Sequence, residues 1–288
     1  MEGLQRMIDG IHYIENHLTD ELRIEEIAAA ACMSKFHFQR LFSMLTGYTV
    51  SEYIRNRRLT VAAQELIHTR AKVIDVAMKY GYDSPESFTK AFQRIHGITP
   101  SAVRKDSRFL KAYPRLSFQI QIKGDVEMEY RMEERAAFTV VGKSIRTTAE
   151  GGQNHQDIAA FWIEANGNGL AAELAKQSGP LGLLGICLDF DQLQENLSYM
   201  IAAEKRDTSI HAGWEERVIP AAAWAIFPVK GAMPDAMPKV WERIFSEWFP
   251  STGYEHAGGP EMEVYMCDGD PSSDDYYSEI WIPVKKDK

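Results

Sequence analysis

The sequence has only three cysteines among its 288 residues, far apart at positions 32, 187 and 267. So few and so scattered thiols predict neither a disulfide framework nor a cysteine metal site. The eight histidines form no H-x3-H or H-E-x2-H pattern, and the sequence contains no Walker loop, nucleophile elbow or G-x-G-x-x-G motif. We therefore expect no catalytic residue, no bound metal and no cofactor.

Long apolar runs are also missing. No stretch approaches the roughly 18 apolar residues that a membrane-spanning helix requires. The N-terminal segment MEGLQRMIDG lacks the apolar run of a secretory signal. These features favour a cytoplasmic protein without a membrane partner. With 45% hydrophobic and 25% charged residues, the composition suits two compact domains better than a disordered chain.

The charge of the chain is unevenly distributed. Residues 1–115 contain 17 Lys and Arg against 13 Asp and Glu, which gives a net charge of +4. Residues 116–288 contain 15 against 28, which gives −13. Such asymmetry favours a nucleic-acid partner for the first part and a different partner for the second.

One stretch of sequence occurs twice, as SKFHFQRLFSMLTGYT from Ser34 and as SPESFTKAFQRIHGIT from Ser84. In both copies apolar residues recur at i, i+3, i+4 and i+7, the pattern of an amphipathic helix that faces a core. The two serines suit helix N-caps, and Gly47 and Gly97 suit the C-terminal stops. A supersecondary unit is therefore used twice.

A short apolar segment and a tight turn precede each copy, which predicts helix-turn-helix units at about 24–46 and 73–97. The outward faces carry Arg, Gln, Ser and Thr, which can hydrogen-bond to bases or phosphates. Two ordinary helical hairpins with solvated faces are the alternative. Matched polar positions in two copies favour DNA binding over that alternative.

The segment 50–69 between the copies contains neither Pro nor Gly, and Thr49 and Glu52 suit a capping box before it. A single helix of this length, about 30 Å long, would hold the two reading helices at a fixed distance. They could then enter successive major-groove segments about 34 Å apart. Three arginines near the start of this helix are candidates for phosphate contact or for plain solvation: Arg55, Arg57 and Arg58.

The motif A-x5-S-x3-F-x-R-x-F-x4-G and the run IDVAMKYGYDSPESFTKAFQRIHGITP resemble the DNA-binding domain of AraC/XylS transcription regulators. The resemblance implies a sequence-specific regulator that binds promoter or operator DNA and works with RNA polymerase. It also implies that the helices after Ser34 and Ser84 read the major groove. Glu86 could accept a hydrogen bond from a cytosine amine or face solvent. The contacting positions carried over are Lys35, Phe36, His37, Gln39, Arg40, Pro85, Glu86, Ser87, Thr89 and Lys90.

The first domain, 1–108, is thus expected to be all-α, and a linker should occupy 109–124, where LSFQIQI alternates like a strand. Beyond it, 125–288 repeats the order strand, strand, helix, strand, strand. This order predicts an α+β domain with a duplicated strand-helix-strand-strand repeat and helices on one face of its sheet. The expected strands are 126–132, 138–145, 181–188, 197–203, 215–219, 222–229, 261–266 and 277–284, and the expected helices are 156–164, 170–177 and 235–248.

The last strand, YYSEIWIPV, places Tyr277, Glu279 and Trp281 on one face and its isoleucines on the other. A carboxylate between two aromatic rings can attract a cation. An exposed edge-strand glutamate beside ordinary aromatic packing is the alternative. On the helix at 235–248, three aromatic residues fall at i, i+4 and i+7 and are expected in the core: Trp241, Phe245 and Trp248.

Residues 126–284 resemble a GyrI-like effector-binding domain, mainly through VWERIFSEWFPSTGYEHAGGPEMEVY and SEIWIPV. The resemblance implies a cleft with aromatic walls and a deep acid that meets a small, cationic or lipophilic effector. The acid that matches is Glu279. The expected wall residues are Trp162, Tyr199, Tyr254 and Tyr265, with Trp281 added by alternation.

Two alternatives to effector binding stay open for the second domain. Some GyrI-like proteins resemble hydrolases, and Glu279 would then serve as general base with Tyr199 or Tyr254 as its partner. The domain could instead be a protein-interaction module. We favour a regulator that is not an enzyme.

Overall fold

The computed structural model describes residues 2–104, 110–117, 127–191, 196–206 and 213–286. The described residues form two compact units. The helical unit contains residues 2–38, 48–104 and 110–117, and the sheet unit contains residues 39–47, 127–191, 196–206 and 213–286. The alternating segment expected to form a strand at 116–122 falls almost wholly outside the described residues.

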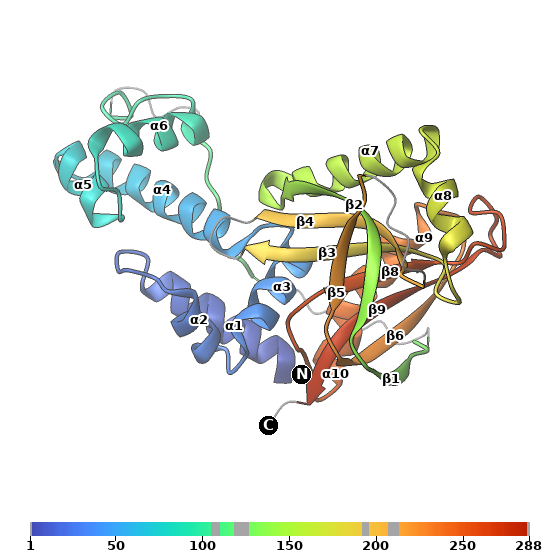
Figure 1. Cartoon of the computed structure of the whole chain (residues 1–288). Coiled ribbons are helices and arrows are strands. Elements are labelled where there is room, and N and C mark those ends of the chain that lie inside the picture. The colour runs from blue at the N-terminus through green and yellow to red at the C-terminus, as the bar shows by residue number, and fades with distance from the viewer. Residues whose placement is uncertain (1, 105–109, 118–126, 192–195, 207–212, 287–288) are drawn as a thin grey trace. The chain divides into compact units, whose positions relative to one another are not determined.

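The predicted helix-turn-helix units and the helix between them are confirmed (Figure 1). The third helix is shared, because its residues from position 39 onward belong to the sheet unit. The first helix was not predicted, and its Gly10 lies so close to Phe38 that a Cβ there would be 2.5 Å from the ring. The bounds are α1 (Glu2–Asn16), α2 (Ile24–Ala30), α3 (Lys35–Thr46), α4 (Val50–His68), α5 (Val73–Lys79) and α6 (Pro85–His96).

Local capping explains where these helices begin and end. The Thr49 hydroxyl accepts from the Glu52 amide, and the Glu52 carboxylate accepts from the Thr49 amide, which completes the predicted capping box. Ser84 accepts from the Ser87 amide at 3.1 Å at the start of α6. Gly97 ends that helix with a φ of 75°, a conformation that costs glycine little.

Two of the three connector arginines are structural. Arg57 donates to both Glu15 carboxylate oxygens at 2.8 Å and to the Tyr113 carbonyl at 2.6 Å. Arg58 donates to the carbonyls of Leu18 and Asp20. Burial acts to raise the pKa of Glu15, but the hydrogen bond from Arg57 lowers it overall. These bonds commit both guanidinium groups to the fold rather than to phosphate.

The sheet unit contains an antiparallel sheet (Figure 1). Its strands lie side by side in the order β1-β6-β9-β8-β3-β4-β2-β5, and β7 pairs with β9. The predicted order of strands and helices is confirmed, but the first strand was placed too early, at 126–132, because its pairing with β6 begins only at Arg131. The three-residue β7 was not expected. The strands are β1 (Arg131–Arg135), β2 (Phe138–Thr148), β3 (Leu183–Asp191), β4 (Asn196–Glu204), β5 (Glu215–Ile219), β6 (Ala222–Lys230), β7 (Tyr254–His256), β8 (Glu261–Tyr265) and β9 (Tyr277–Lys286). The helices are α7 (Gln153–Gly167), α8 (Leu170–Gln177), α9 (Ala236–Arg243), the π-helical turn Ile244–Trp248, and α10 (Phe249–Ser251).

Strand register assigns side chains to the two faces of this sheet. Gly185 of β3 lies opposite Ile201 of β4 and opposite Glu263 of β8, so these three share one face. Ile201 packs with residues of α7 and α8, which makes this the helix face. The other face carries Trp281 and Trp224 within a continuous apolar cluster. Because that cluster draws on the strands β2–β6, β8 and β9, the second face is filled rather than open.

Within the described ranges, no helix combines the length and the apolar character needed to cross a membrane.

Candidate functional site

Four aromatic side chains and one carboxylate converge on the helix face of the sheet. The Glu263 carboxylate accepts from Trp241 Nε1 at 2.9 Å, from the Tyr265 hydroxyl at 2.8 Å and from the Tyr199 hydroxyl at 3.2 Å. Trp162 Nε1 donates to the Tyr199 hydroxyl at 2.8 Å. We call Glu263, Trp162, Tyr199, Trp241 and Tyr265 the acid–aromatic site. It joins α7, β4, β8 and α9 in one hydrogen-bonded group.

The surroundings of the Glu263 carboxylate disfavour its ionised form. Burial among the rings raises the pKa of Glu263, and the hydrogen bonds from Trp241, Tyr265 and Tyr199 offset only part of that increase. Its donors are neutral, and no ion-pair partner of Glu263 occurs among the described residues. A cation placed here would therefore meet an incompletely compensated acid beside aromatic faces.

The absence of a side chain at Gly185 makes this geometry possible. A Cβ on Gly185 would lie 2.1 Å from the Tyr199 hydroxyl and 3.2 Å from a Glu263 carboxylate oxygen. The tyrosine hydroxyl therefore lies directly over the backbone of β3. Tyr199 is 2% exposed, whereas Glu263, Trp162, Trp241 and Tyr265 are partly exposed. The site thus has a buried base and walls that solvent reaches.

Glu279, the acid expected from the last strand, lies on the opposite face and is 4% exposed. Its oxygens accept from Arg131 at 2.7 and 3.0 Å, from the Tyr277 hydroxyl at 2.7 Å and from Trp281 Nε1 at 2.8 Å. Burial acts to raise the pKa of Glu279, but the hydrogen bonds, that of Arg131 first, lower it overall. Tyr277, Glu279 and Trp281 share one face of β9 as expected, and the Arg131 guanidinium is already bound to Glu279.

The structure therefore divides the residues expected to bind an effector. Trp162, Tyr199 and Tyr265 meet at Glu263, Trp281 meets Glu279, and Tyr254 stacks on Trp248 at 5.6 Å. Sequence reasoning missed Glu263 and assigned its partner Trp241 to the core. The signal was present in EMEVY, because period-two alternation puts Glu261, Glu263 and Tyr265 on one face of the strand.

Two expected DNA-contacting side chains, Gln39 and Arg40, also belong to the sheet unit. Arg40 donates from Nε and Nη2 to the two oxygens of Glu261, at 2.7 and 2.6 Å. Its guanidinium carbon lies 5.4 Å from the ring centre of Trp241 and 5.2 Å from that of Phe245. The arginine is thus held by an acid and two aromatic rings.

The other expected DNA contacts lie along α3 and α6. Lys35 pairs with Glu25 at 2.8 Å, and His37 is buried. Phe36 and Gln39 are partly exposed. On α6 the exposed or partly exposed positions are Pro85, Glu86, Ser87, Thr89 and Lys90, of which Ser87 joins the N-cap.

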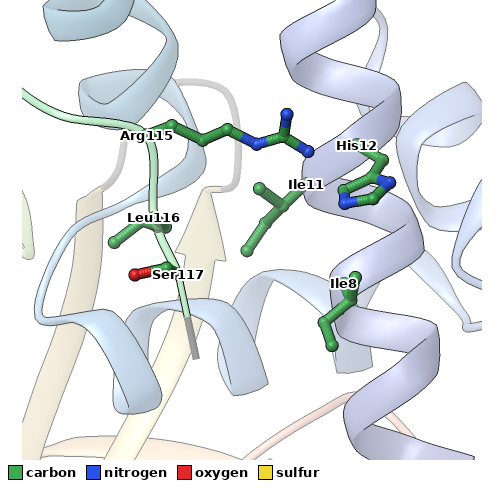
Figure 2. Close-up of a pocket in the computed structure, with 6 residues that line it drawn as sticks. All are labelled: Ile8, Ile11, His12, Arg115, Leu116 and Ser117. Carbon is green, nitrogen blue, oxygen red and sulfur yellow. The ribbon is translucent and has the colours of Figure 1, made fainter. Parts of the chain in front are cut away.

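A separate cavity of about 530 Å³ lies in the helical unit. Figure 2 shows Ile8, Ile11 and His12 of α1 facing the extended segment that contains Arg115. The remaining lining residues are Leu116 and Ser117. This lining is apolar with a basic side chain and has no acid, so it does not suit a cationic ligand.

Family models match both parts of the chain. Residues 27–106 match a helix-turn-helix domain, and residues 128–285 match the GyrI-like small molecule binding domain. The second match alone covers more than half of the 288 residues. The matched segments agree with the α2–α6 helices and with the sheet unit.

Individual relatives agree with these matches. The Tn10 TetD protein of Escherichia coli is 43% identical over 34% of this chain and 71% of its own length. The transcriptional activator AarP of Providencia stuartii is 45% identical over 32% of this chain and 68% of its own. The structure of SAV2435 bound to tetraphenylphosphonium is 30% identical with a TM-score of 0.50, over 55% of this chain and 94% of that one. The chain therefore belongs to the family of the GyrI-like small molecule binding domain, which it carries after an AraC-type helix-turn-helix DNA-binding domain.

Proposed function

We propose that this DNA-binding transcription regulator binds a lipophilic organic cation in its acid–aromatic site. The observation that carries the proposal is the Glu263 carboxylate, whose donors are two tyrosines and a tryptophan and whose pKa burial raises. Aromatic faces attract cations, and a desolvated carboxylate adds a full opposite charge. The similarity to SAV2435, a structure that contains the lipophilic cation tetraphenylphosphonium, supports the same ligand class.

The hydrolase alternative finds less support in this geometry. It requires Glu279 to act as a general base with Tyr199 or Tyr254. The Tyr199 hydroxyl instead contacts Glu263 on the opposite face of the sheet, and Tyr254 stacks on Trp248. The oxygens of Glu279 accept four hydrogen bonds, which leaves them poorly placed to take a proton from a substrate.

Titration of the full-length protein with tetraphenylphosphonium tests the ligand class. Trp162 and Trp241 belong to the site, so we expect saturable quenching of tryptophan fluorescence and a rise in the melting temperature. The phosphonium should act at concentrations at which an anionic aromatic compound, such as tetraphenylborate, does not. Equal binding of the two compounds would indicate a nonspecific apolar surface and would count against the proposal.

We propose further that α3 and α6 contact DNA through the exposed and partly exposed positions among those expected, which excludes the buried His37. Replacing Gln39 by alanine should weaken binding to a site selected from a random DNA library by roughly 1–3 kcal/mol and relax its sequence preference. Gln93→Ala is the matched control, since Gln93 is an exposed glutamine of α6 outside the expected contacts. An equal loss on random DNA would show that Gln39 contacts only the backbone.

A further inference from the structure

In the sheet unit, the Arg40 guanidinium contacts the Glu261 carboxylate and two aromatic rings. The Arg40 side chain is 20% exposed, and the Glu261 side chain that it pairs with is 5% exposed. Both donor nitrogens lie within 2.7 Å of a carboxylate oxygen, which is the two-pronged geometry that an arginine and a carboxylate prefer. The pair joins positions that are 221 residues apart in the sequence.

This pair shares its surroundings with the acid–aromatic site. Trp241 lies under the Arg40 guanidinium at 5.4 Å and also donates to Glu263 at 2.9 Å. Glu261 and Glu263 are two residues apart on the same face of β8. Arg40 therefore offers what a lipophilic cation would offer there, a positive charge over an aromatic ring beside a carboxylate.

The balance of charge in this region depends on Arg40. Burial acts to raise the pKa of Glu261, but the charge of Arg40, followed by the neighbouring His256, lowers it to about 2. His256 Nδ1 accepts from the Gly258 amide, so the proton of a neutral ring is on Nε2, 3.1 Å from Glu261. Burial lowers the pKa of His256, which keeps this ring neutral. Without Arg40, the buried Glu261 carboxylate would have no cationic partner in the described part of the chain.

We propose that Arg40 is an internal ligand of this region and that a cationic effector displaces it. The inference rests on the proposed function, because it identifies what the effector competes with. Arg40 is also one of the side chains expected to read DNA. Displacement by the effector frees the guanidinium for DNA, and DNA binding in turn frees the site for the effector. The two ligands then raise each other's affinity by the same factor.

The first experiment measures tetraphenylphosphonium binding to the full-length wild type, Arg40→Ala and Lys72→Ala. If Arg40 occupies its place about nine-tenths of the time, its removal should tighten binding roughly tenfold. The matched control is Lys72→Ala, which removes an equal charge from an exposed position before α5 and should leave the affinity unchanged. Equal affinities of the wild type and Arg40→Ala would overturn the competition, although binding by both would still support the proposed function.

The second experiment needs no effector. Glu261→Gln releases Arg40 and should raise affinity for a DNA site selected from a random library severalfold. Glu216→Gln removes a carboxylate of β5 that pairs with Lys205, and it corrects for the loss of one negative charge. Unchanged DNA affinity in Glu261→Gln would overturn the proposal. Should this variant not fold, Glu261→Asp shortens the same acid and must give a smaller increase.

The two experiments distinguish failure of the proposed ligand class from failure of the competition by Arg40. If no protein binds the phosphonium, the proposed ligand class is wrong, and the DNA affinity of Glu261→Gln still decides whether Arg40 is withheld from DNA. If the phosphonium binds and neither the Arg40 nor the Glu261 variant changes an affinity, only the competition is wrong.

Discussion

The Glu263→Gln variant should lose tetraphenylphosphonium affinity by about 100-fold, equivalent to about 2.7 kcal/mol. The amide keeps the shape of the side chain but removes the charge that attracts the cation. It also replaces one acceptor with a donor, which opposes the N–H and O–H groups of Trp241, Tyr265 and Tyr199. Fluorescence titration of the full-length variant gives the measurement.

The pH dependence of binding follows from the raised pKa of Glu263. Only the ionised carboxylate attracts the phosphonium, whose own charge does not change with pH. The affinity of the wild type should therefore rise with pH until Glu263 is fully ionised and then stay constant, and binding below that pH should release protons. Glu263→Gln should show no such rise, because the titrating group is gone.

Glu279→Gln is the matched control, because Glu279 is also a hydrogen-bonded glutamate of the same sheet with tryptophan and tyrosine donors. Because Arg131 pairs with Glu279, the Glu279→Gln variant should lose stability and keep its phosphonium affinity. If Glu279→Gln loses the affinity and Glu263→Gln keeps it, the effector site is at the acid that the sequence resemblance indicated.

The helix-turn-helix units were predictable because their signals are local. Ser84, Gly97 and the Thr49 capping box each act within four residues of themselves, and the structure shows all of them in those roles. The apolar spacing that begins at Phe38 and Phe88 also depends only on helical geometry, and both rings are fully buried. Such features require no knowledge of distant partners.

The acid–aromatic site was predicted only in part because its members come from four elements. Alternation places a side chain on a face but does not say which helix covers that face. The helix of Trp241 adds a second reason, since its continuation at Ile244–Trp248 is a π-helical turn. A π-helical turn contains an extra residue, so a spacing counted at 3.6 residues per turn does not hold across it. Trp241 was therefore grouped with Trp248, which packs against different rings.

Sequence patterns could not identify the partners of Arg40 and Arg57 for a related reason. Arg57 pairs with Glu15, 42 residues away, and Arg40 pairs with Glu261, 221 residues away. No periodicity links such positions. An arginine on an exposed helix face and an arginine in a buried ion pair can have the same neighbours in the sequence. Only the fold decides whether the partner of the guanidinium is a phosphate or another protein group.

Gly142→Ala should destabilise the sheet unit by more than about 4 kcal/mol, a large part of the 5–15 kcal/mol by which domains are usually stable. Gly142 lies in β2 between Ala202 of β4 and Glu215 of β5. A Cβ added there would be 2.0 Å from the Ile201 carbonyl oxygen and 2.8 Å from the Ala202 Cα. Both atoms belong to the backbone, so no side-chain rotation relieves the overlap, and β4 would have to move away from β2.

Gly167→Ala provides the control, because a Cβ at this position of α7 has no atom within 4 Å. This variant should be unchanged or up to about 1 kcal/mol more stable, since alanine favours helix more than glycine does. Thermal unfolding followed by near-ultraviolet circular dichroism reports on the tryptophans of the sheet unit. A loss in Gly142→Ala no larger than that of an ordinary surface substitution, about 0.5 kcal/mol, would mean that β2 and β4 do not approach so closely. Since β4 also carries Tyr199, that result would count against the geometry of the acid–aromatic site as well.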